Sequence, residues 1–259
     1  MSLIARMPAI FYGHGSPMNA LEDNAYTRVW HSLAERFARP KAILVISAHW
    51  TTRGTEVTAM AVPKTIHDFG GFPKALFDVR YPAPGDPSLA ARVAEILAPF
   101  PVKMDHNWGL DHGTWSVLIK AYPKADIPVI QLSLDMDKGA SFHFALGQKL
   151  ACLRDEGVMI IGSGNVVHNL ARMDPRSSGY DWALRFNSVM RGAILAGQFE
   201  QVVNYQSLGA DAALSVPTSE HFLPLLYILG ARLADEPVEI VAEGMELGAI
   251  SMMSVVVGK

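Results

Sequence analysis

The sequence predicts a single α/β domain with a central, mostly parallel sheet flanked by helices. Short apolar runs rich in Val and Ile alternate with longer stretches of helical periodicity, which is the pattern of βαβ units. Several of these runs lack the alternation of a half-exposed strand, as expected of strands covered on both faces. The 259 residues contain no low-complexity tract, internal repeat or long linker, so we expect one domain over residues 1–259.

Seven apolar runs are the candidate strands. Five of them are Ala9–Tyr12, Ala42–Ala48, Val57–Val62, Ile127–Leu134 and Val158–Ile161. The other two lie in the tail, within Val238–Val257 on either side of Glu243-Gly244, and are expected to close as an antiparallel pair.

Helical periodicity separates the strands. The expected helices are Leu21–Phe37, Pro87–Leu97, Gly113–Tyr122 and Ser141–Asp155. The last has the clearest apolar face, formed by Phe142, Leu146, Leu150 and Leu153. A further buried helix is expected over Phe222–Leu229. It should begin close to Glu220 and His221, because Pro224 fits only the first turn of a helix.

Composition excludes several classes of protein. A net charge of −3 with mixed signs does not suit a nucleic-acid binder, which needs a basic face. A single cysteine, Cys152, excludes a disulfide scaffold and a cysteine-based zinc site, and it fits a reducing cytoplasm. No apolar run reaches the roughly 18–20 residues that span a bilayer. Arg6 and Pro8 interrupt the first apolar run, so we expect no signal peptide.

Three of the nine histidines follow candidate strands: His14, His49 and His168. If the strands are parallel, these imidazoles emerge at one edge of the sheet, where open α/β sheets bind ligands. We expect His14 and His49 to end adjacent strands. A single histidine in this position is more often a hydrogen-bonded residue at a strand end, but three together favour a metal site, since neutral imidazole is a common metal ligand.

Two further histidines are candidates for the same site. His221 lies with Glu220 at an expected helix start, where the pair could either bind a metal or complement the helix dipole. His112 lies between Asp111 and a helix start with tryptophans nearby, which suits either an acid–base group or a packed loop.

The remaining histidines have plainer settings. His67 lies with Asp68, Phe69 and Phe72 around a Gly-Gly turn that could form a lid over the site. The other three are expected at the surface: His31, His106 and His143.

Seven motifs, in order along nearly the whole chain, resemble those of the class III extradiol ring-cleavage dioxygenases, and most closely the 4,5-DOPA dioxygenase extradiol group. They are GHGSPMNALEDN from Gly13, SAHW from Ser47, IHDFGGFP from Ile66, YPAPG from Tyr81, DHGTW from Asp111, GSGNVVHNL from Gly162 and PTSEHFLPLLY from Pro217.

The resemblance implies an α/β enzyme that opens catechol rings with O₂ at one non-haem divalent metal per chain. It matches His14 and His49 to metal ligands, His221 with Glu220 to the C-terminal ligand segment, and His112 to an active-site histidine. His168 matches a histidine that is either a ligand or the catalytic base. The implied partner is a small aromatic diol, DOPA-like or related. One of His112 and His168 would take a hydroxyl proton and the other would act as the acid.

Aromatic side chains are expected to hold the substrate ring between them. The candidates are Trp50, Phe69, Trp108 and Trp115.

The same residues leave the metal and the reaction open. Iron oxygenases usually have two histidines and one carboxylate, whereas three histidines also suit zinc. A zinc hydrolase built on the same ligands is therefore the alternative function. A carrier that merely binds a metal or small ligand is disfavoured, because it needs no acid–base pair. The oligomeric state is not predicted.

Overall fold

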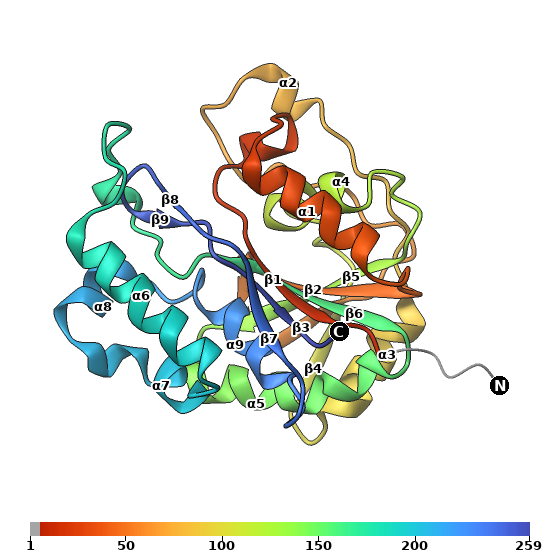
Figure 1. Cartoon of the computed structure of the whole chain (residues 1–259). Coiled ribbons are helices and arrows are strands. Elements are labelled where there is room, and N and C mark those ends of the chain that lie inside the picture. Colours follow the sequence, from red (N-terminus) through yellow and green to blue (C-terminus); the bar gives the residue numbers. More distant parts are fainter. Residues whose placement is uncertain (1–5) are drawn as a thin grey trace.

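The computed structural model describes residues 6–259, and its centre is an eight-stranded sheet with helices on both faces (Figure 1). The strand order is β4-β3-β5-β2-β6-β1-β10-β7. The strand bounds are Ala9–Gly13 (β1), Ala42–Thr52 (β2), Thr55–Thr58 (β3), Val102–Asp105 (β4), Val129–Asp135 (β5), Val158–Gly164 (β6), Val238–Ala242 (β7) and Ser254–Val257 (β10). Met245–Glu246 (β8) and Ile250–Ser251 (β9) form a separate two-stranded hairpin.

Helices from both halves of the chain cover the sheet. One face is packed by α1 (Ala25–Arg36) and α4 (His112–Ala121), and the other by α3 (Pro87–Leu97), α5 (Ala140–Leu150) and α9 (Leu223–Gly230). The remaining helices are α2 (Lys74–Phe77), α6 (Asp181–Leu195), α7 (Phe199–Val203) and α8 (Ala210–Ser215). Single 3₁₀ turns occupy Pro17–Ala20 (η1), Ala151–Arg154 (η2), Leu170–Arg172 (η3) and Tyr205–Leu208 (η4).

The central strands are buried on both faces, which explains why their sequences are continuously apolar. Phe11 and Leu44 pack on the side of α3, α5 and α9, whereas their neighbours Ile10 and Val45 pack on the side of α1 and α4. All four side chains are fully buried. Alternate residues of one strand thus serve two cores, and the predicted α/β class is confirmed.

The four central strands, β5, β2, β6 and β1, run parallel to one another. Their carboxyl ends therefore meet at one edge of the sheet, as expected. β6 lies between β2 and β1, so the expectation that His14 and His49 end adjacent strands is wrong. The strands outside this group include antiparallel pairs, β3 with β5 and β10 with β1.

The predicted antiparallel pairing of the tail is confirmed. β7 pairs with β10, and β10 continues the sheet by pairing with β1. The two strands are not joined by a simple turn at Glu243-Gly244, because the β8–β9 hairpin lies between them.

Several predicted boundaries differ from the structure. The strand expected over Val57–Val62 ends at Thr58, and Val62 is 84% exposed, because the chain turns out of the sheet before Pro63. The helix expected from Leu21 begins at Ala25, where the Asn24 side chain caps it. The helix expected over Ser141–Asp155 ends at Leu150 and continues as the 3₁₀ turn η2.

The surface position expected for His143 is wrong, because this residue is fully buried in α5. It lies three and seven residues before Leu146 and Leu150, on the helix face that packs against α9. Its Nδ1 lies 3.1 Å from the hydroxyl of Tyr227, which satisfies part of its hydrogen-bonding capacity. His31 and His106 are exposed, as expected.

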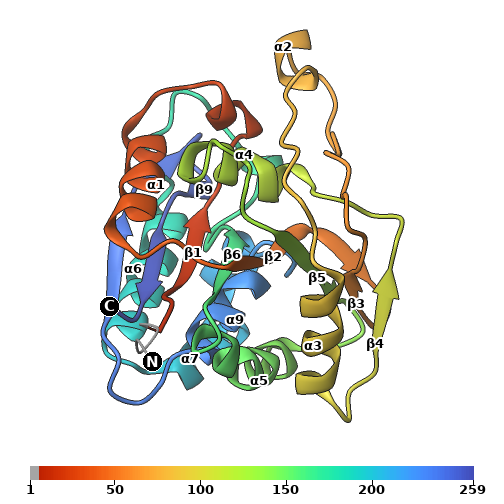
Figure 2. The same cartoon turned by 90° about the vertical axis from the view of Figure 1, so that its right-hand side faces the viewer.

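A long excursion between β3 and α3 carries the short helix α2 away from the body of the molecule (Figure 2). Among the helices of residues 6–259, none is long and apolar enough to cross a membrane. The expectation about a signal peptide rests partly on residues 1–5, which lie outside the described part of the chain.

Two glycines of β6 allow α9 to approach the sheet closely. A Cβ on Gly162 would meet the carbonyl oxygen of Pro224, and a Cβ on Gly164 would meet that of His221. Such backbone contacts cannot move without shifting the start of α9.

We therefore expect Gly164→Ala to lower the free energy of unfolding by about 1–3 kcal/mol through overpacking. Gly192→Ala is the matched control, because that exposed glycine of α6 has open space around it. The control should leave stability unchanged or raise it by up to about 1 kcal/mol. Urea unfolding of both variants makes the comparison, and an equal effect would show that the close approach is not needed.

Candidate metal centre and active-site cavity

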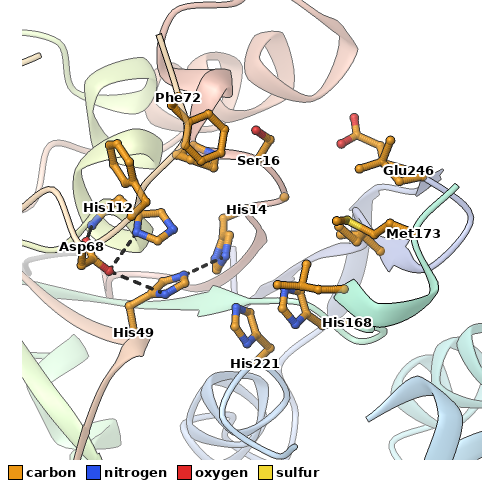
Figure 3. Close-up of a pocket in the computed structure, with 16 residues that line it drawn as sticks. His14, Ser16, His49, Asp68, Phe72, His112, His168, Met173, His221 and Glu246 are labelled. Carbon is orange, nitrogen blue, oxygen red and sulfur yellow. Dashed lines mark hydrogen bonds and ion pairs between the residues drawn. The ribbon is translucent and has the colours of Figure 1, made fainter. Parts of the chain in front are cut away.

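Five histidines line one cavity of about 450 Å³ at the carboxyl ends of the parallel strands (Figure 3). They are His14, His49, His112, His168 and His221. His14 directly follows β1, and His49 lies in β2 beyond the point where its register with β5 shifts. His168 follows β6, so the predicted convergence of the three strand-end histidines is confirmed.

His14 is held in a single tautomer by Ser163. The Ser163 hydroxyl donates its proton to the carbonyl of Gly113 over 2.6 Å, so it can only accept from the His14 Nδ1–H, 3.0 Å away. The lone pair of His14 Nε2 is therefore available to a ligand. A hydrogen bond of this kind to the other ring nitrogen is typical of metal-binding histidines.

The alternation of β6 explains why Ser163 faces His14. At Gly162 and Gly164 a side chain would point toward α9. Because side chains alternate along a strand, the side chain of the residue between them, Ser163, points to the opposite face, toward α4. Ser163 is fully buried there. The GSG sequence thus combines close helix packing on one face with a hydrogen-bonding group on the other.

His14 and His49 point their Nε2 atoms at each other across 3.2 Å. The Nδ1 of His49 faces the Asp68 Oδ2 at 3.7 Å. Two nitrogens bound to one ion at about 2.1 Å lie roughly 3–3.5 Å apart, so this pair already has the spacing of two ligands of one metal.

His221 lies two residues before α9, as the position of Pro224 predicted. Its Nδ1 lies 3.1 Å from Glu220 Oε1, which accepts the ring proton and leaves Nε2 free. Burial opposes ionisation of Glu220, but the hydrogen bond with His221 prevails and lowers its pKa to about 2. Glu220 does not line the cavity, so its carboxylate orients His221 from behind.

His14, His49 and His221 form a nearly equilateral triangle of rings. The ring centres are 5.0 Å apart for His14–His49, 5.5 Å for His14–His221 and 5.0 Å for His49–His221. Three imidazoles on one tetrahedral ion have ring centres roughly 5 Å apart. The donor set therefore fits a divalent metal.

His112 offers a different third nitrogen, since its ligand atom lies within 4.8 Å of those of His14 and His49. Its ring centre, however, is 3.7 Å from that of His49 and 6.1 Å from that of His14. This uneven spacing suits a residue beside the metal better than a third ligand.

Asp68 holds His112 by two hydrogen bonds. Its Oδ1 accepts from the backbone N–H of His112 and its Oδ2 from the Nδ1–H, both at 2.9 Å. Burial alone would raise the pKa of Asp68, but the hydrogen bonds and charge of His112 lower it overall. Asp68 therefore stays ionised, and by accepting the Nδ1 proton it selects the neutral tautomer of His112 whose lone pair is on Nε2. Asp111, the predicted neighbour, caps α4 instead by accepting from Thr114 N.

His168 stacks on His221 with ring centres 3.4 Å apart and planes 7° from parallel. In-plane lone pairs of two parallel rings do not converge on one ion, so this geometry favours His168 as a group next to the metal. Burial and the neighbouring His221 lower the pKa of His168 to about 3.

The metal-facing histidines are neutral. Burial, followed by the proximity of the other imidazoles, holds the pKa values of His14 and His49 well below their usual value. Neutral imidazole is the form that binds metals, so no proton must be displaced before an ion enters.

Comparison with known proteins agrees with this geometry. Residues 8–258 match the family described as the catalytic LigB subunit of aromatic ring-opening dioxygenase. The chain belongs to this family. Membership confirms the resemblance to the extradiol dioxygenases and, with it, the predicted class of enzyme.

The LigB family relatives match along nearly the whole chain. A 4,5-DOPA dioxygenase extradiol from Escherichia coli K12 is 57% identical over 259 residues, covering 98% of this chain and 95% of that protein. One from Beta vulgaris is 40% identical over 248 residues, covering 93% and 92%. The crystal structure of an uncharacterized protein from Escherichia coli K12 superposes with a TM-score of 0.86 and 50% identity, covering 98% of this chain and 100% of that one.

Within this LigB-family cavity, only Phe69 of the four predicted aromatic residues is part of the lining. Trp50 and Trp108 stack on each other at 5.8 Å, and Trp115 is buried with its indole N–H donated to the carbonyl of Ile66. The expectation is therefore wrong for the three tryptophans, and Phe69 alone of the four stays a candidate for contact with a substrate ring. Phe72 joins Phe69 in the wall, so the segment predicted as a lid does border the cavity.

Three side chains of the site were not predicted as site residues from the sequence. Asp68 was expected only as part of the lid, although it accepts two hydrogen bonds from His112. The other two are Ser163 and Glu246, and Glu246 lies on the opposite rim of the cavity (Figure 3). A period-two pattern in β6 could have found Ser163. Glu246 has no local signal, because its position depends on how the β8–β9 hairpin folds back.

We expect His14→Ala and His49→Ala to abolish stoichiometric binding of a divalent metal while the protein stays folded. Ser163→Ala should weaken binding by about 10- to 100-fold, because it releases the His14 ring. His31→Ala, an exposed histidine on α1, is the control and should bind normally. Metal analysis and calorimetric titration, with circular dichroism for the fold, measure these effects. Unchanged affinity in both alanine variants would place the metal elsewhere.

Proposed function

We propose that this protein is an Fe(II)-dependent extradiol dioxygenase that cleaves a small DOPA-like catechol with O₂. The observation that supports it best is the triangle of His14, His49 and His221 beside the His112–Asp68 pair in one cavity. The printed names of the relatives from Escherichia coli and Beta vulgaris support a DOPA-like substrate.

His14, His49 and His221 would hold the metal. When bound there, a redox-active ion such as Fe(II) supplies Lewis acidity toward the catechol oxygens and a path for electrons from the ring to O₂. Zn²⁺ suits the same three nitrogens but has no redox chemistry, so we assign turnover to iron.

His112 is the residue that takes a proton from the substrate. Its Nδ1–H is donated to Asp68, so its Nε2 can accept a proton from a catechol hydroxyl. The negative charge of Asp68 then stabilises the imidazolium that forms, in the manner of a carboxylate–histidine pair.

His168 is the second proton-transfer group of the proposal. Its pKa of about 3 makes it neutral in the free protein. It becomes an acid only after receiving a proton from the substrate, and it then returns that proton to an oxygen that gains electrons.

The apolar wall protects this chemistry from water. The Phe69 ring lies 5.4 Å from that of His112 and 5.3 Å from that of Phe72. Met173 lies across the cavity from Phe72 (Figure 3), and Leu170 and Leu247 also line the cavity. A dry cavity strengthens the Asp68–His112 interaction and limits side reactions of activated oxygen.

We further propose that residues 1–259 act as one catalytic domain in the cytoplasm. A single eight-stranded sheet, which includes strands from β1 to β10, supports one domain. The lone, exposed Cys152 suits a reducing compartment.

The proposal predicts that protein loaded with Fe(II) under argon consumes O₂ when air and a DOPA-like catechol are added. The product should be a yellow ring-opened compound, cleaved beside the two hydroxyls. Zinc-loaded protein should bind the catechol without consuming O₂. An oxygen electrode, absorbance and mass spectrometry give the readouts.

An iron-loaded, folded sample that takes up no O₂ with any of a broad panel of catechols would contradict the proposal. Hydrolysis of an ester or amide by that sample would instead favour the zinc-hydrolase alternative.

We expect His112→Ala to lower kcat by about 100-fold or more, which is the usual size of a general acid–base contribution, with metal content unchanged. Asp68→Asn should also lower kcat strongly, because both Asp68 oxygens accept hydrogen bonds from His112 and an amide can accept only one of them, so the tautomer of the ring is no longer fixed. His168→Ala should also lower kcat by about 100-fold and leave metal content intact.

Metal content separates these roles from ligation. A loss of bound metal in His168→Ala would make His168 a fourth ligand, and a loss in His112→Ala would make His112 the third. Wild-type turnover in both would end the acid–base assignment.

A further inference from the structure

Two carboxylates line the cavity, and only one of them has a partner. Asp68 is used by His112 and faces His49. Glu246 of β8 lies on the opposite rim, as Figure 3 shows, and among the described residues its carboxylate takes part in no hydrogen bond or ion pair. Burying part of an ionised carboxylate without a partner costs free energy, unless a ligand brings a positive charge next to it.

The surroundings of Glu246 make its negative charge still less favourable. Burial raises the pKa of its carboxyl, and the nearby carboxylate of Glu22 raises it further. The cavity lining contains no lysine or arginine, and Figure 3 shows the Glu246 carboxylate apart from the five histidines. A cationic group entering at this rim would meet an uncompensated negative charge, whereas a carboxylate would meet repulsion and no donor of positive charge.

The backbone fixes where Glu246 stands. Glu246 pairs with Ile250 in the β8–β9 hairpin, and its carbonyl accepts the N–H of Ala249 across a tight turn. Leu247 and Gly248 are the central residues of the β-turn from Glu246 to Ala249, and both have positive φ, at 51° and 75°, as a type I′ turn requires.

The same hairpin is tied to the histidine side of the cavity. Ile250 forms an isolated β-bridge with His168. The backbone of Glu246 is therefore held at a fixed separation from that of His168. The Glu246 carboxylate can then favour substrates whose side chain has the length to reach it.

We propose that Glu246 binds the side-chain ammonium of the substrate, so that the enzyme selects catechols whose side chain ends in a free amine. The preferred order is an ammonium-bearing catechol first, a neutral one next and a carboxylate-bearing one last. An amino-acid catechol retains the ammonium and belongs to the first class, whereas a caffeate-like acid belongs to the last. This inference rests on the proposed function, because it assigns the substrate class of that site.

The test compares three catechols that differ in the charge at the end of a short side chain: dopamine, 4-ethylcatechol and 3,4-dihydroxyphenylpropionate. The iron-loaded wild type should show kcat/KM for dopamine roughly 10- to 100-fold above that for 4-ethylcatechol, the range of a charge-assisted hydrogen bond. In Glu246→Gln the dopamine-to-ethylcatechol ratio should fall to near one. The acid should gain relative to the neutral compound.

Glu243→Gln is the matched control. Glu243 lies three residues away, pairs with Arg191 and does not line the cavity. This variant should keep the wild-type ratio.

A binding measurement keeps the two hypotheses separate. Calorimetric titration of zinc-loaded protein with the same three compounds needs no turnover, and the wild type should bind dopamine more tightly than 4-ethylcatechol while Glu246→Gln should not.

Turnover of 4-ethylcatechol without any preference for dopamine, or a ratio unchanged in Glu246→Gln, would overturn the role of Glu246 and leave the dioxygenase intact. Absence of O₂ uptake with all three would overturn the proposed function, and the titration would still decide whether Glu246 binds the amine.

Discussion

The close approach of α9 to β6 is the constraint on which the site depends. Gly162 and Gly164 have no Cβ, so the carbonyl oxygens of Pro224 and His221 lie where side chains would otherwise be. A similar contact joins Gly147 of α5 to the backbone of Tyr227 in α9. Close packing on two sides brings His221 to the edge where β1 and β2 deliver His14 and His49. A wider spacing would move the His221 ring away from those of His14 and His49.

Hydrogen bonds to two carboxylates and one hydroxyl set the orientation and the tautomer of three of the cavity histidines. Asp68, Glu220 and Ser163 each accept a ring proton on Nδ1, from His112, His221 and His14 respectively. Each of these hydrogen bonds selects the neutral tautomer in which Nδ1 carries the proton and Nε2 carries the lone pair. The same kind of hydrogen bond thus sets the ring orientation of the two proposed metal ligands, His14 and His221, and of the proposed base, His112.

Much of this could be predicted from the sequence, because the relevant signals are local. Continuous apolar strands, histidines directly after them and Pro224 at a helix start gave the parallel sheet, His14, His49 and the position of His221. The residues that were mispredicted depend on tertiary contacts. His143 is polar yet faces α9, Trp50 pairs with Trp108 instead of the cavity, and Glu246 reaches the rim only through the β8–β9 hairpin. No pattern of neighbouring residues encodes such contacts.

The pairing of β1 with β10 bears on how the molecule assembles. Ala9 lies opposite Val257, so two neighbours in the sheet are almost the whole chain apart in sequence. Contacts of such long range form slowly, because the entropy of closing the loop must be overcome before they contribute stability. On the ribosome, β1 has no β10 partner until nearly all of the chain has been made. The strand that leads into His14 therefore cannot have both of its neighbours, β6 and β10, before β10 has been made.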